Sequence, residues 1–263
     1  MMKIGITGGT GRMGRQLIQD VLDNHLCKLT GVTSKSAAGE DVGSLLGHAA
    51  TGIIIHQDLE KLVRESDAII DFSAPINTLA CARLAAEMGK IHVIGTTGMN
   101  EDQQAQIKSY ASRTAIVYSA NMSIGVNLLV GLVEQAARIL GTDYDIEIVE
   151  MHHKHKVDSP SGTALALGEA AAKGRGIALK TASILSREGV IGARPEGKIG
   201  FATLRGGDVI GDHTVIFAGE GERIEISHKA SSRHIYVKGA IRAALWAKGQ
   251  KPGLYSMKDV LGL

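Results

Sequence analysis

The sequence predicts an α/β fold, in which an N-terminal domain with a parallel sheet is followed by a second, α+β domain with an open mixed sheet. Strand and helix patterns alternate up to about residue 122, and such alternation is typical of a parallel sheet. A glycine-rich turn joins the first strand to the first helix. Beyond residue 183, short strand patterns follow one another with Gly-rich turns between them, which indicates a sheet of a different kind.

The N-terminal segment has the pattern of a strand, a glycine loop and a helix. Residues 3–7 resemble a short strand, and apolar residues from Met13 to Leu22 recur at helical spacing. The loop between them contains G-x-G-x-x-G, and free N–H groups at the start of a helix bind pyrophosphate. We therefore expect a Rossmann-type dinucleotide site rather than a purely structural turn. Its expected contacts are Gly8, Gly9, Thr10, Gly11, Arg12 and Met13.

The alternation continues through expected strands at residues 53–56, 68–73 and 92–95, with a helix at residues 76–88. In a doubly wound sheet, ligands lie beyond the carboxyl ends of the strands. The loops at three strand ends, residues 71–75, 95–98 and 119–122, should therefore touch the cofactor as well, and the last two supply the expected contacts. The residues expected there are Gly95, Thr96, Thr97, Ser119, Ala120, Asn121 and Met122.

The end of the second strand, around residues 31–36, predicts which cofactor is used. NAD-preferring folds usually place Asp or Glu there, where it binds the ribose hydroxyls and repels a 2′-phosphate. This chain has Ser34 with Lys35 beside it, and Arg12 in the glycine loop supplies a second cation. We expect NADPH to be preferred over NADH, with NADH still accepted. The alternative is that Lys35 is merely solvated.

The most unusual stretch runs from Glu150 to Thr163, with three histidines and two lysines in five consecutive positions. Packing of a core does not explain so many adjacent polar residues, because buried polar groups need hydrogen-bond partners. Histidine changes charge near neutrality, so the cluster suggests an anion site with a general acid/base pair. Pro160 and Gly162 then mark a turn and a helix start, where free N–H groups bind carboxylate or phosphate.

Other interpretations of this cluster remain open. It is also compatible with an ordinary basic surface loop. Zinc bound by His152, His153, His155 and Asp158 is a further alternative, although adjacent residues of a strand point to opposite faces and two lysines would repel the ion. For the whole protein, the rival functions are a dinucleotide-binding redox sensor and a zinc hydrolase.

The second half of the chain contains an expected helix at residues 124–140, a strand leading into the histidine cluster, and several later strands. His213 and His228 are expected to be satisfied sheet residues. A helix from residue 233 to about 248 is expected to close the chain. We therefore expect residues 1–122 plus 233–263 to form the dinucleotide-binding domain, and residues 123–232 to form the substrate-binding and oligomerisation domain.

Composition limits the partners. The 263 residues are 44% hydrophobic, which predicts a folded, soluble chain with a real core. A formal charge of +2 and 3% aromatic residues argue against nucleic acid. No apolar run is long enough for a membrane span. Two cysteines give no disulfide framework and the N-terminus has no signal-peptide pattern, so we expect a cytoplasmic protein.

Over its whole length the sequence resembles the 4-hydroxy-tetrahydrodipicolinate reductase family, pyridine-nucleotide enzymes of diaminopimelate and lysine biosynthesis. The most specific part of the resemblance is the stretch from Glu150 to Leu165; Gly8 to Gly14, Gly95 to Gly98 and Gly200 to Asp208 also fit. The family precedent implies a homotetramer through the sheets of the second domains.

The resemblance also implies roles for individual residues. His152 would be the proton donor or acceptor and Lys156 the proton donor, while His153, Gly162 and Thr163 would bind the dicarboxylate substrate. The dinucleotide would be held by Gly8 to Met13, Gly95 to Thr97 and Ser119 to Met122. No metal is implied.

Overall fold

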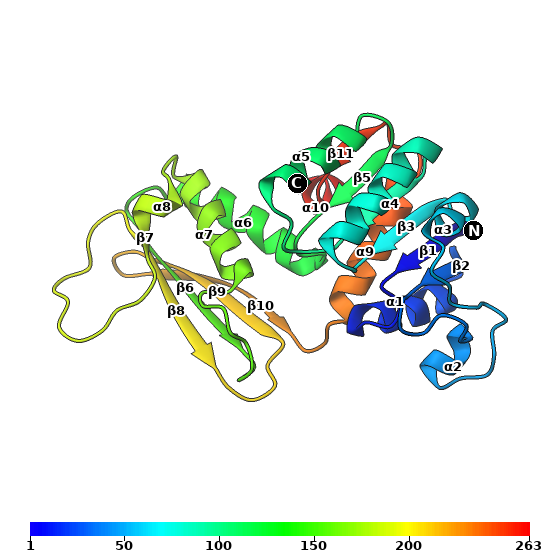
Figure 1. Cartoon of the computed structure of the whole chain (residues 1–263). Helices are drawn as coiled ribbons and strands as arrows, with labels where there is room; N and C mark the ends of the chain where they lie inside the picture. Colours follow the sequence, from blue (N-terminus) through cyan, green and yellow to red (C-terminus); the bar gives the residue numbers. More distant parts are fainter. The chain divides into compact units, whose positions relative to one another are not determined.

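A computed structural model describes all residues of the chain, from Met1 to Leu263. The chain divides into two compact units (Figure 1). Unit 1 contains Met1–Ile124 and His234–Leu263, and unit 2 contains Gly125–Arg233. The domain boundaries expected from the sequence lie after residues 122 and 232. None of the helices combines the length and apolarity needed to cross a membrane.

Unit 1 is built on a six-stranded sheet in which every pairing is parallel, with strand order β11-β5-β4-β3-β1-β2. This confirms the predicted Rossmann-type arrangement. The strands are β1 (Met2–Thr7), β2 (Cys27–Thr33), β3 (Ala68–Asp71), β4 (Ile91–Ile94), β5 (Ala115–Tyr118) and β11 (Gly253–Tyr255). The helices are α1 (Arg12–Asp23), α2 (Val42–Leu46), α3 (Leu59–Glu65), α4 (Pro75–Met88), α5 (Glu101–Tyr110), α9 (His234–Ala247) and α10 (Met257–Leu261).

The central strands of unit 1 are buried on both faces, which explains why all four residues of β3 are apolar or paired. Leu17 of α1 and Ala244 of α9 pack in one apolar cluster with Ile6 of β1. Ala82 of α4 and Ile107 of α5 pack in another, with Ile116 of β5. Helices thus supply apolar side chains to separate clusters of the core, and the loops at the strand ends are left to carry function.

Unit 2 has a five-stranded mixed sheet with strand order β10-β9-β6-β8-β7. The central strand β6 (Asp145–His152) runs parallel to β8 (Ile199–Arg205) and antiparallel to β9 (Gly211–Ala218). The outer strands are β7 (Ser183–Ile184) and β10 (Arg223–Ala230), and the helices are α6 (Ile124–Leu140), α7 (Gly162–Gly174) and α8 (Leu179–Ala182). This confirms the predicted α+β domain with an open mixed sheet.

One face of this sheet packs on helices. Side chains of β6 alternate strictly, so that Ile146, Ile148, Glu150 and His152 lie on the buried face. Apolar residues of α6 and α7, including Val133 and Leu167, form one cluster with that face. The same alternation that builds the core therefore carries two polar side chains of β6 inward.

Two expectations about individual elements were wrong. Residues 53–56 are not a strand, because only single bridges pair Thr33 with His56 and Asp41 with Ile54. The chain also does not end in the helix that begins near residue 233. It continues into the edge strand β11 and the short helix α10, which is capped by Ser256.

Candidate functional site

The glycine loop of unit 1 is packed too tightly for side chains. Gly8 has φ of +73°, a conformation that glycine adopts without strain. A Cβ atom at Gly9 would lie 2.1 Å from Val32 Cγ1, and one at Gly14 would lie 2.2 Å from the Gly8 carbonyl oxygen. Gly11 is the N-cap of α1 and is exposed. The loop therefore offers bare backbone at a helix N-terminus, which fits a dinucleotide pyrophosphate.

Three hydroxyl groups meet where β2 ends. Thr10 Oγ1 lies 2.9 Å from Ser34 Oγ, and Ser36 Oγ lies 3.2 Å from Thr10 Oγ1 and 3.3 Å from Ser34 Oγ. Lys35 and Arg12 are both exposed. The site predicted to read the ribose thus contains hydroxyl donors and cations, and no carboxylate occupies the Ser34 position.

The other loops expected to hold the dinucleotide follow β4 and β5, at the same edge of the parallel sheet as the glycine loop. Thr96 is buried and its hydroxyl turns inward to Thr78, at 2.9 Å, whereas Thr97 is exposed. Ser119 Oγ donates to the Asn121 carbonyl oxygen at 2.8 Å, which closes the turn after β5. Ala120 is exposed and Met122 is buried. Thr97, Ala120 and the backbone of these turns are the groups left to meet a ligand.

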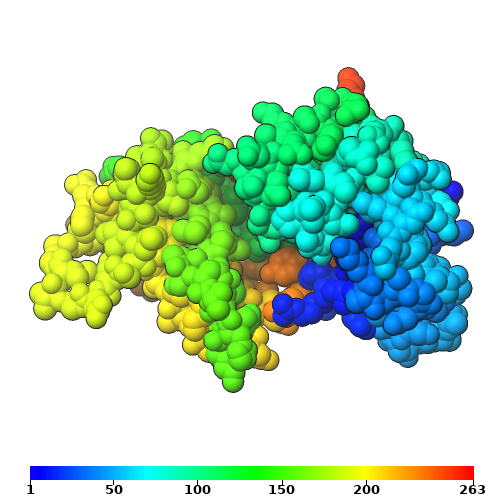
Figure 2. Space-filling model, viewed as in Figure 1, coloured from blue at the N-terminus to red at the C-terminus, as the bar shows by residue number.

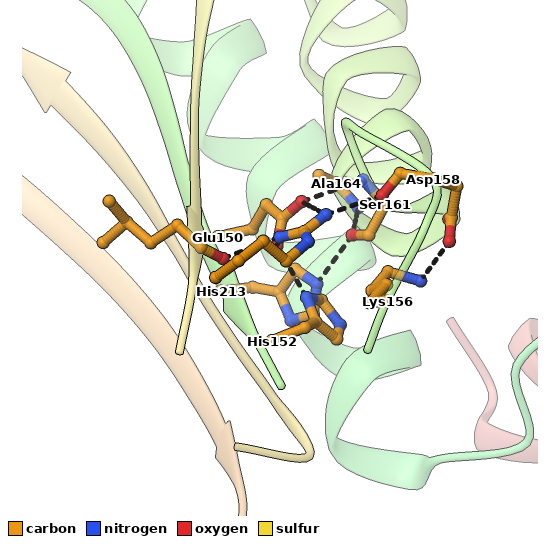
Figure 3. A network of polar contacts seen from close by, with 9 residues as sticks. Glu150, His152, Lys156, Asp158, Ser161, Ala164 and His213 are labelled. Atoms are coloured by element: carbon orange, nitrogen blue, oxygen red, sulfur yellow. Dashed lines mark hydrogen bonds and ion pairs between the residues drawn. The ribbon is translucent and has the colours of Figure 1, made fainter. Parts of the chain in front are cut away.

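In unit 2, the end of β6 places a carboxylate against a histidine (Figure 3). Glu150 and His152 lie two residues apart on the strand and therefore share its buried face. His152 Nδ1 donates to Glu150 Oε2 over 2.6 Å, so the ring orientation is fixed and Nε2 is the nitrogen that does not bond to Glu150. A Cβ at Gly211 would lie 2.9 Å from that Nε2, so a glycine makes room for the ring.

Glu150 is itself clamped. Arg205, which lies opposite His152 in the β6–β8 register, donates to both carboxylate oxygens, at 2.8 and 2.9 Å. The backbone N–H of Ser161 donates to Oε1 at 3.0 Å. Burial by itself raises the pKa of Glu150, but the hydrogen bonds from Arg205, His152 and Ser161 outweigh it and hold the pKa below its usual value. The carboxylate is therefore charged and fixed in position.

A second histidine, His213, supports this cluster from β9. Its Nε2 lies 3.1 Å from Ser161 Oγ, which also accepts from the Ala164 N–H as the N-cap of α7. Its ring meets that of His152 edge to face, with centroids 5.1 Å apart. Burial, together with the nearby His152, lowers the pKa of His213 to about 4, so this imidazole is neutral.

The loop after β6 presents further cations, and Figure 2 shows this part of the chain, coloured between green and yellow, at the surface of unit 2. Lys156 Nζ pairs with Asp158 Oδ1 at 2.8 Å. Burial and the surrounding cations, Arg233 first among them, lower the pKa of His153. Lys154 and His155 are exposed. The ring of His155 lies 6.3 Å from that of His153, whereas His152 turns to Glu150, so the three histidines do not converge on one point.

Gly162 begins α7, directly after the N-cap Ser161. It is exposed, and a Cβ added to it would meet no atom within 4 Å. The packing of the chain therefore does not require glycine here, and the space that a side chain would enter is open. Thr163 is half-buried beside it. A helix N-terminus of this kind, next to Lys156, suits a carboxylate.

The structure brings together four residues to which the sequence analysis assigned no role in the site, namely Glu150, Ser161, Arg205 and His213. The signal for Glu150 was its two-residue spacing from His152 on a strand. Arg205 and His213 lie more than fifty positions after Glu150 and His152 in the sequence, so only the pairing of the strands shows that they are neighbours. His213 was expected to be a satisfied sheet residue. His213 Nε2 lies within hydrogen-bond distance of Ser161 Oγ and its ring contacts His152, but its Nδ1 has no hydrogen-bond partner. The Nδ1 of His228 has none either, so neither histidine is fully satisfied.

Comparison with protein families gives matches along nearly the whole chain. Residues 2–122 match the model described as dihydrodipicolinate reductase, N-terminus, and residues 125–261 match dihydrodipicolinate reductase, C-terminus. Proteins called 4-hydroxy-tetrahydrodipicolinate reductase from Rhodopseudomonas palustris (strain BisA53) and Ruegeria sp. (strain TM1040) are 54% and 51% identical to this chain. The alignments cover 100% and 99% of this chain and 97% and 98% of those relatives.

Solved structures show the same fold. A dihydrodipicolinate reductase from Paenisporosarcina sp. TG-14 with dipicolinate bound aligns with a TM-score of 0.77 at 24% identity, covering 97% of each chain. A probable dehydrogenase from Thermotoga maritima aligns with a TM-score of 0.61 at 12% identity, covering 98% of this chain and 92% of that one.

Proposed function

This chain belongs to the dihydrodipicolinate reductase family, and from that premise we propose that it reduces 4-hydroxy-tetrahydrodipicolinate to tetrahydrodipicolinate in lysine and diaminopimelate biosynthesis. The substrate is a cyclic imine dicarboxylate. Reduction adds a hydride and a proton to the ring and releases water. The observation that best supports this function is the clamped Glu150–His152 pair, which lies beside the cations and the free helix N-terminus of unit 2.

His152 and Lys156 would carry the proton chemistry. With Nδ1 held by a charged Glu150, His152 presents Nε2 as the atom that takes up or gives a proton, and the carboxylate keeps the ring in one orientation while it does so. Lys156 is half-buried and held by Asp158, so its ammonium group is positioned to donate a proton to a nitrogen that gains electron density.

The two carboxylates of the substrate need charge and N–H donors. Gly162 offers a backbone N–H at the start of α7, and Thr163 adds a hydroxyl one residue later. His153 adds an imidazole in a strongly cationic neighbourhood. Charge-assisted hydrogen bonds to carboxylates are stronger than neutral ones, so such a set favours a dicarboxylate over a neutral ring.

Unit 1 would hold the cofactor. When bound, the reduced nicotinamide supplies the hydride. Gly8 to Met13 would contact the pyrophosphate, with the turns at Gly95–Thr97 and Ser119–Met122 at the same sheet edge. We infer a preference for NADPH, because hydroxyls of Thr10, Ser34 and Ser36 lie together beside Lys35, and Arg12 opens α1.

The direct test is oxidation of NADPH by the purified protein in the presence of enzymatically generated hydroxy-tetrahydrodipicolinate. We expect turnover that depends on both compounds. Protein that binds NADPH but never oxidises it with this or any other imine would instead support a dinucleotide sensor. Stoichiometric zinc together with hydrolytic activity would support the rival hydrolase.

A further inference from the structure

A buried polar cluster lies under the cofactor loops of unit 1. Asp71, the last residue of β3, is fully buried, and so is His92 of β4. His92 Nε2 lies 3.3 Å from Asp71 Oδ2. A full charge is seldom buried unless it is paired, because desolvation of an isolated ion is costly. A carboxylate in this position therefore needs an explanation beyond packing.

The other oxygen of Asp71 ties together the ends of three strands. Its Oδ1 accepts from Thr7 Oγ1 at 2.7 Å, at the end of β1 just before the glycine loop. It also accepts from the N–H and the hydroxyl of Ser73, at 2.9 and 2.5 Å, and from Thr96 Oγ1 at 3.3 Å. Ser73 follows β3 and Thr96 follows β4. Asp71 Oδ1 thus bonds to the last residue of β1 and to the loops that follow β3 and β4.

The loop that Asp71 holds is wedged between two glycines of the cofactor site. A Cβ at Gly8 would come within 2.9 Å of the Phe72 carbonyl oxygen. A Cβ at Gly95 would come within 2.3 Å of the Phe72 ring. The path of residues 71–73 therefore fixes how closely the backbone at Gly8 and at Gly95 approaches, and Asp71 fixes that path.

His92 lies against the second carboxylate oxygen of Asp71. Apart from the contact between His92 Nε2 and Asp71 Oδ2, neither ring nitrogen of His92 nor Asp71 Oδ2 has a hydrogen-bond partner. The groups that face the pair are hydroxyls of Thr7, Ser73 and Thr96 and the buried thiol of Cys81 on α4. Burial by itself raises the pKa of Asp71, but His92, Ser73 and Thr7 outweigh it and lower the pKa to about 2.

We propose that Asp71 is a positioning residue for the dinucleotide site: its carboxylate, paired with buried His92, holds the loops after β1, β3 and β4 in the arrangement that the cofactor needs. This inference rests on the proposed function, because it assumes that these loops bind a pyridine nucleotide. Asp71 does not contact the substrate in this scheme. Its effect should therefore fall on cofactor affinity and leave the proton chemistry of unit 2 intact.

The test is the dissociation constant of NADPH for Asp71→Asn, measured by calorimetry on the full chain, together with steady-state kinetics. A displaced binding loop costs about ten- to a hundredfold, so we expect the Kd and the KM for NADPH to rise by that factor. The kcat at saturating NADPH and the KM for the dicarboxylate should change far less. A merely structural role would instead lower the folded fraction and, with it, the apparent kcat, while the Kd for NADPH of the molecules that remain folded stayed close to that of wild type.

Matched variants make the outcome decisive. Asp67→Asn makes the same change just before β3, where the carboxylate binds the Lys3 N–H, and should leave the Kd unchanged. Ser73→Ala removes one hydroxyl from Asp71 and should raise the Kd in the same direction even if Asp71→Asn does not fold.

Unchanged NADPH affinity in both Asp71→Asn and Ser73→Ala would overturn the inference. So would stoichiometric zinc that is lost in Cys81→Ala, because Asp71, Cys81 and His92 have ligand atoms within 4.8 Å of one another and would then be a metal site. Wild-type protein that binds no NADPH at all would contradict the proposed function instead.

Discussion

At the scale of single residues, the central feature is that Glu150 decides which nitrogen of His152 is available. A charged carboxylate at 2.6 Å from Nδ1 fixes both the ring orientation and the proton on that nitrogen. Arg205 and the Ser161 N–H hold the carboxylate in turn. The histidine cluster is prominent in the sequence, but its working geometry comes from these less conspicuous neighbours.

His213 should make the stability of the protein pH-dependent. Its pKa is about 4 in the folded chain against 6.5 for an ordinary histidine, so between these values the unfolded chain binds the extra proton. The unfolding free energy should therefore be fully present above about pH 6.5 and fall as the pH drops toward 4, by on the order of 3 kcal/mol. Urea unfolding across this pH range measures it.

The control for this prediction is His213→Gln, whose amide can still bond to Ser161 but does not titrate. The variant should lose less stability than wild type on acidification. Parallel stability profiles for the two proteins would show that His213 is not the group responsible.

Lys35 should contribute to the choice of cofactor. A charge-assisted contact with a 2′-phosphate contributes about 1.5 to 3 kcal/mol, so Lys35→Ala should lower the ratio of kcat/KM for NADPH to that for NADH by roughly tenfold or more. The value for NADH itself should hardly change, because NADH has no phosphate at that position. A wild-type preference for NADH, or a ratio unaffected by the substitution, would refute this role.

At the scale of elements, the sequence predicted well wherever hydrophobic periodicity was long. The glycine loop, α1, α4, β6 and α9 lie within a few residues of the expected ranges. Residues 53–56 have the apolar pattern of a strand but pair only through single bridges, so periodicity could not exclude a strand there. The strand β11 has only three residues, which is too short for periodicity to detect.

The candidate site shows the same limit. Residues in the 150–163 stretch could be singled out because they are neighbours in sequence. Arg205 and His213 could not, because their positions depend on the pairing of β6 with β8 and β9, which a single sequence does not specify. Asp71 was visible as a strand end, but its buried partner His92 was not.

The start of α7 gives a prediction at this scale. Position 162 does not require a glycine. Its φ is not positive, and a Cβ atom added there would meet no other atom within 4 Å. Gly162→Ala should therefore leave stability unchanged or raise it by about 0.4 to 1 kcal/mol. The added methyl would occupy the space above the free N–H, so the KM for the dicarboxylate should rise.

Thermal unfolding and steady-state kinetics of Gly162→Ala separate these two effects, with NADPH affinity as the internal control. A KM for the dicarboxylate equal to that of wild type would show that this helix start does not hold the substrate.

At the scale of the whole molecule, we propose a homotetramer through the sheets of unit 2. The face of this sheet opposite the helices carries Val149, Met151, Leu204 and Ile216, and the side chain of Leu204 is among the exposed large apolar groups. Exposed apolar side chains gathered on one sheet face favour association. Light scattering should give the mass of four 27.7 kDa chains.

A charge on that face should dissociate the assembly. Leu204→Asp should lower the mass, whereas Ile224→Asp is the control, because Ile224 pairs with Phe217 and so lies on the other face of the same sheet. A monomeric wild type, or an assembly unaffected by Leu204→Asp, would contradict this interface.

The central claim is that the histidine–lysine site of unit 2 performs the proton chemistry of a reduction whose cofactor is held by unit 1. The most direct measurement compares kcat and NADPH affinity in His152→Ala, Lys156→Ala and the control Lys154→Ala, which removes an exposed cation from the same loop. A positioned acid or base contributes about 10²- to 10⁴-fold, so kcat should fall by that factor in the first two and hardly at all in the control. The Kd for NADPH should stay close to that of wild type in all three. Near-normal turnover in either His152→Ala or Lys156→Ala would contradict the account.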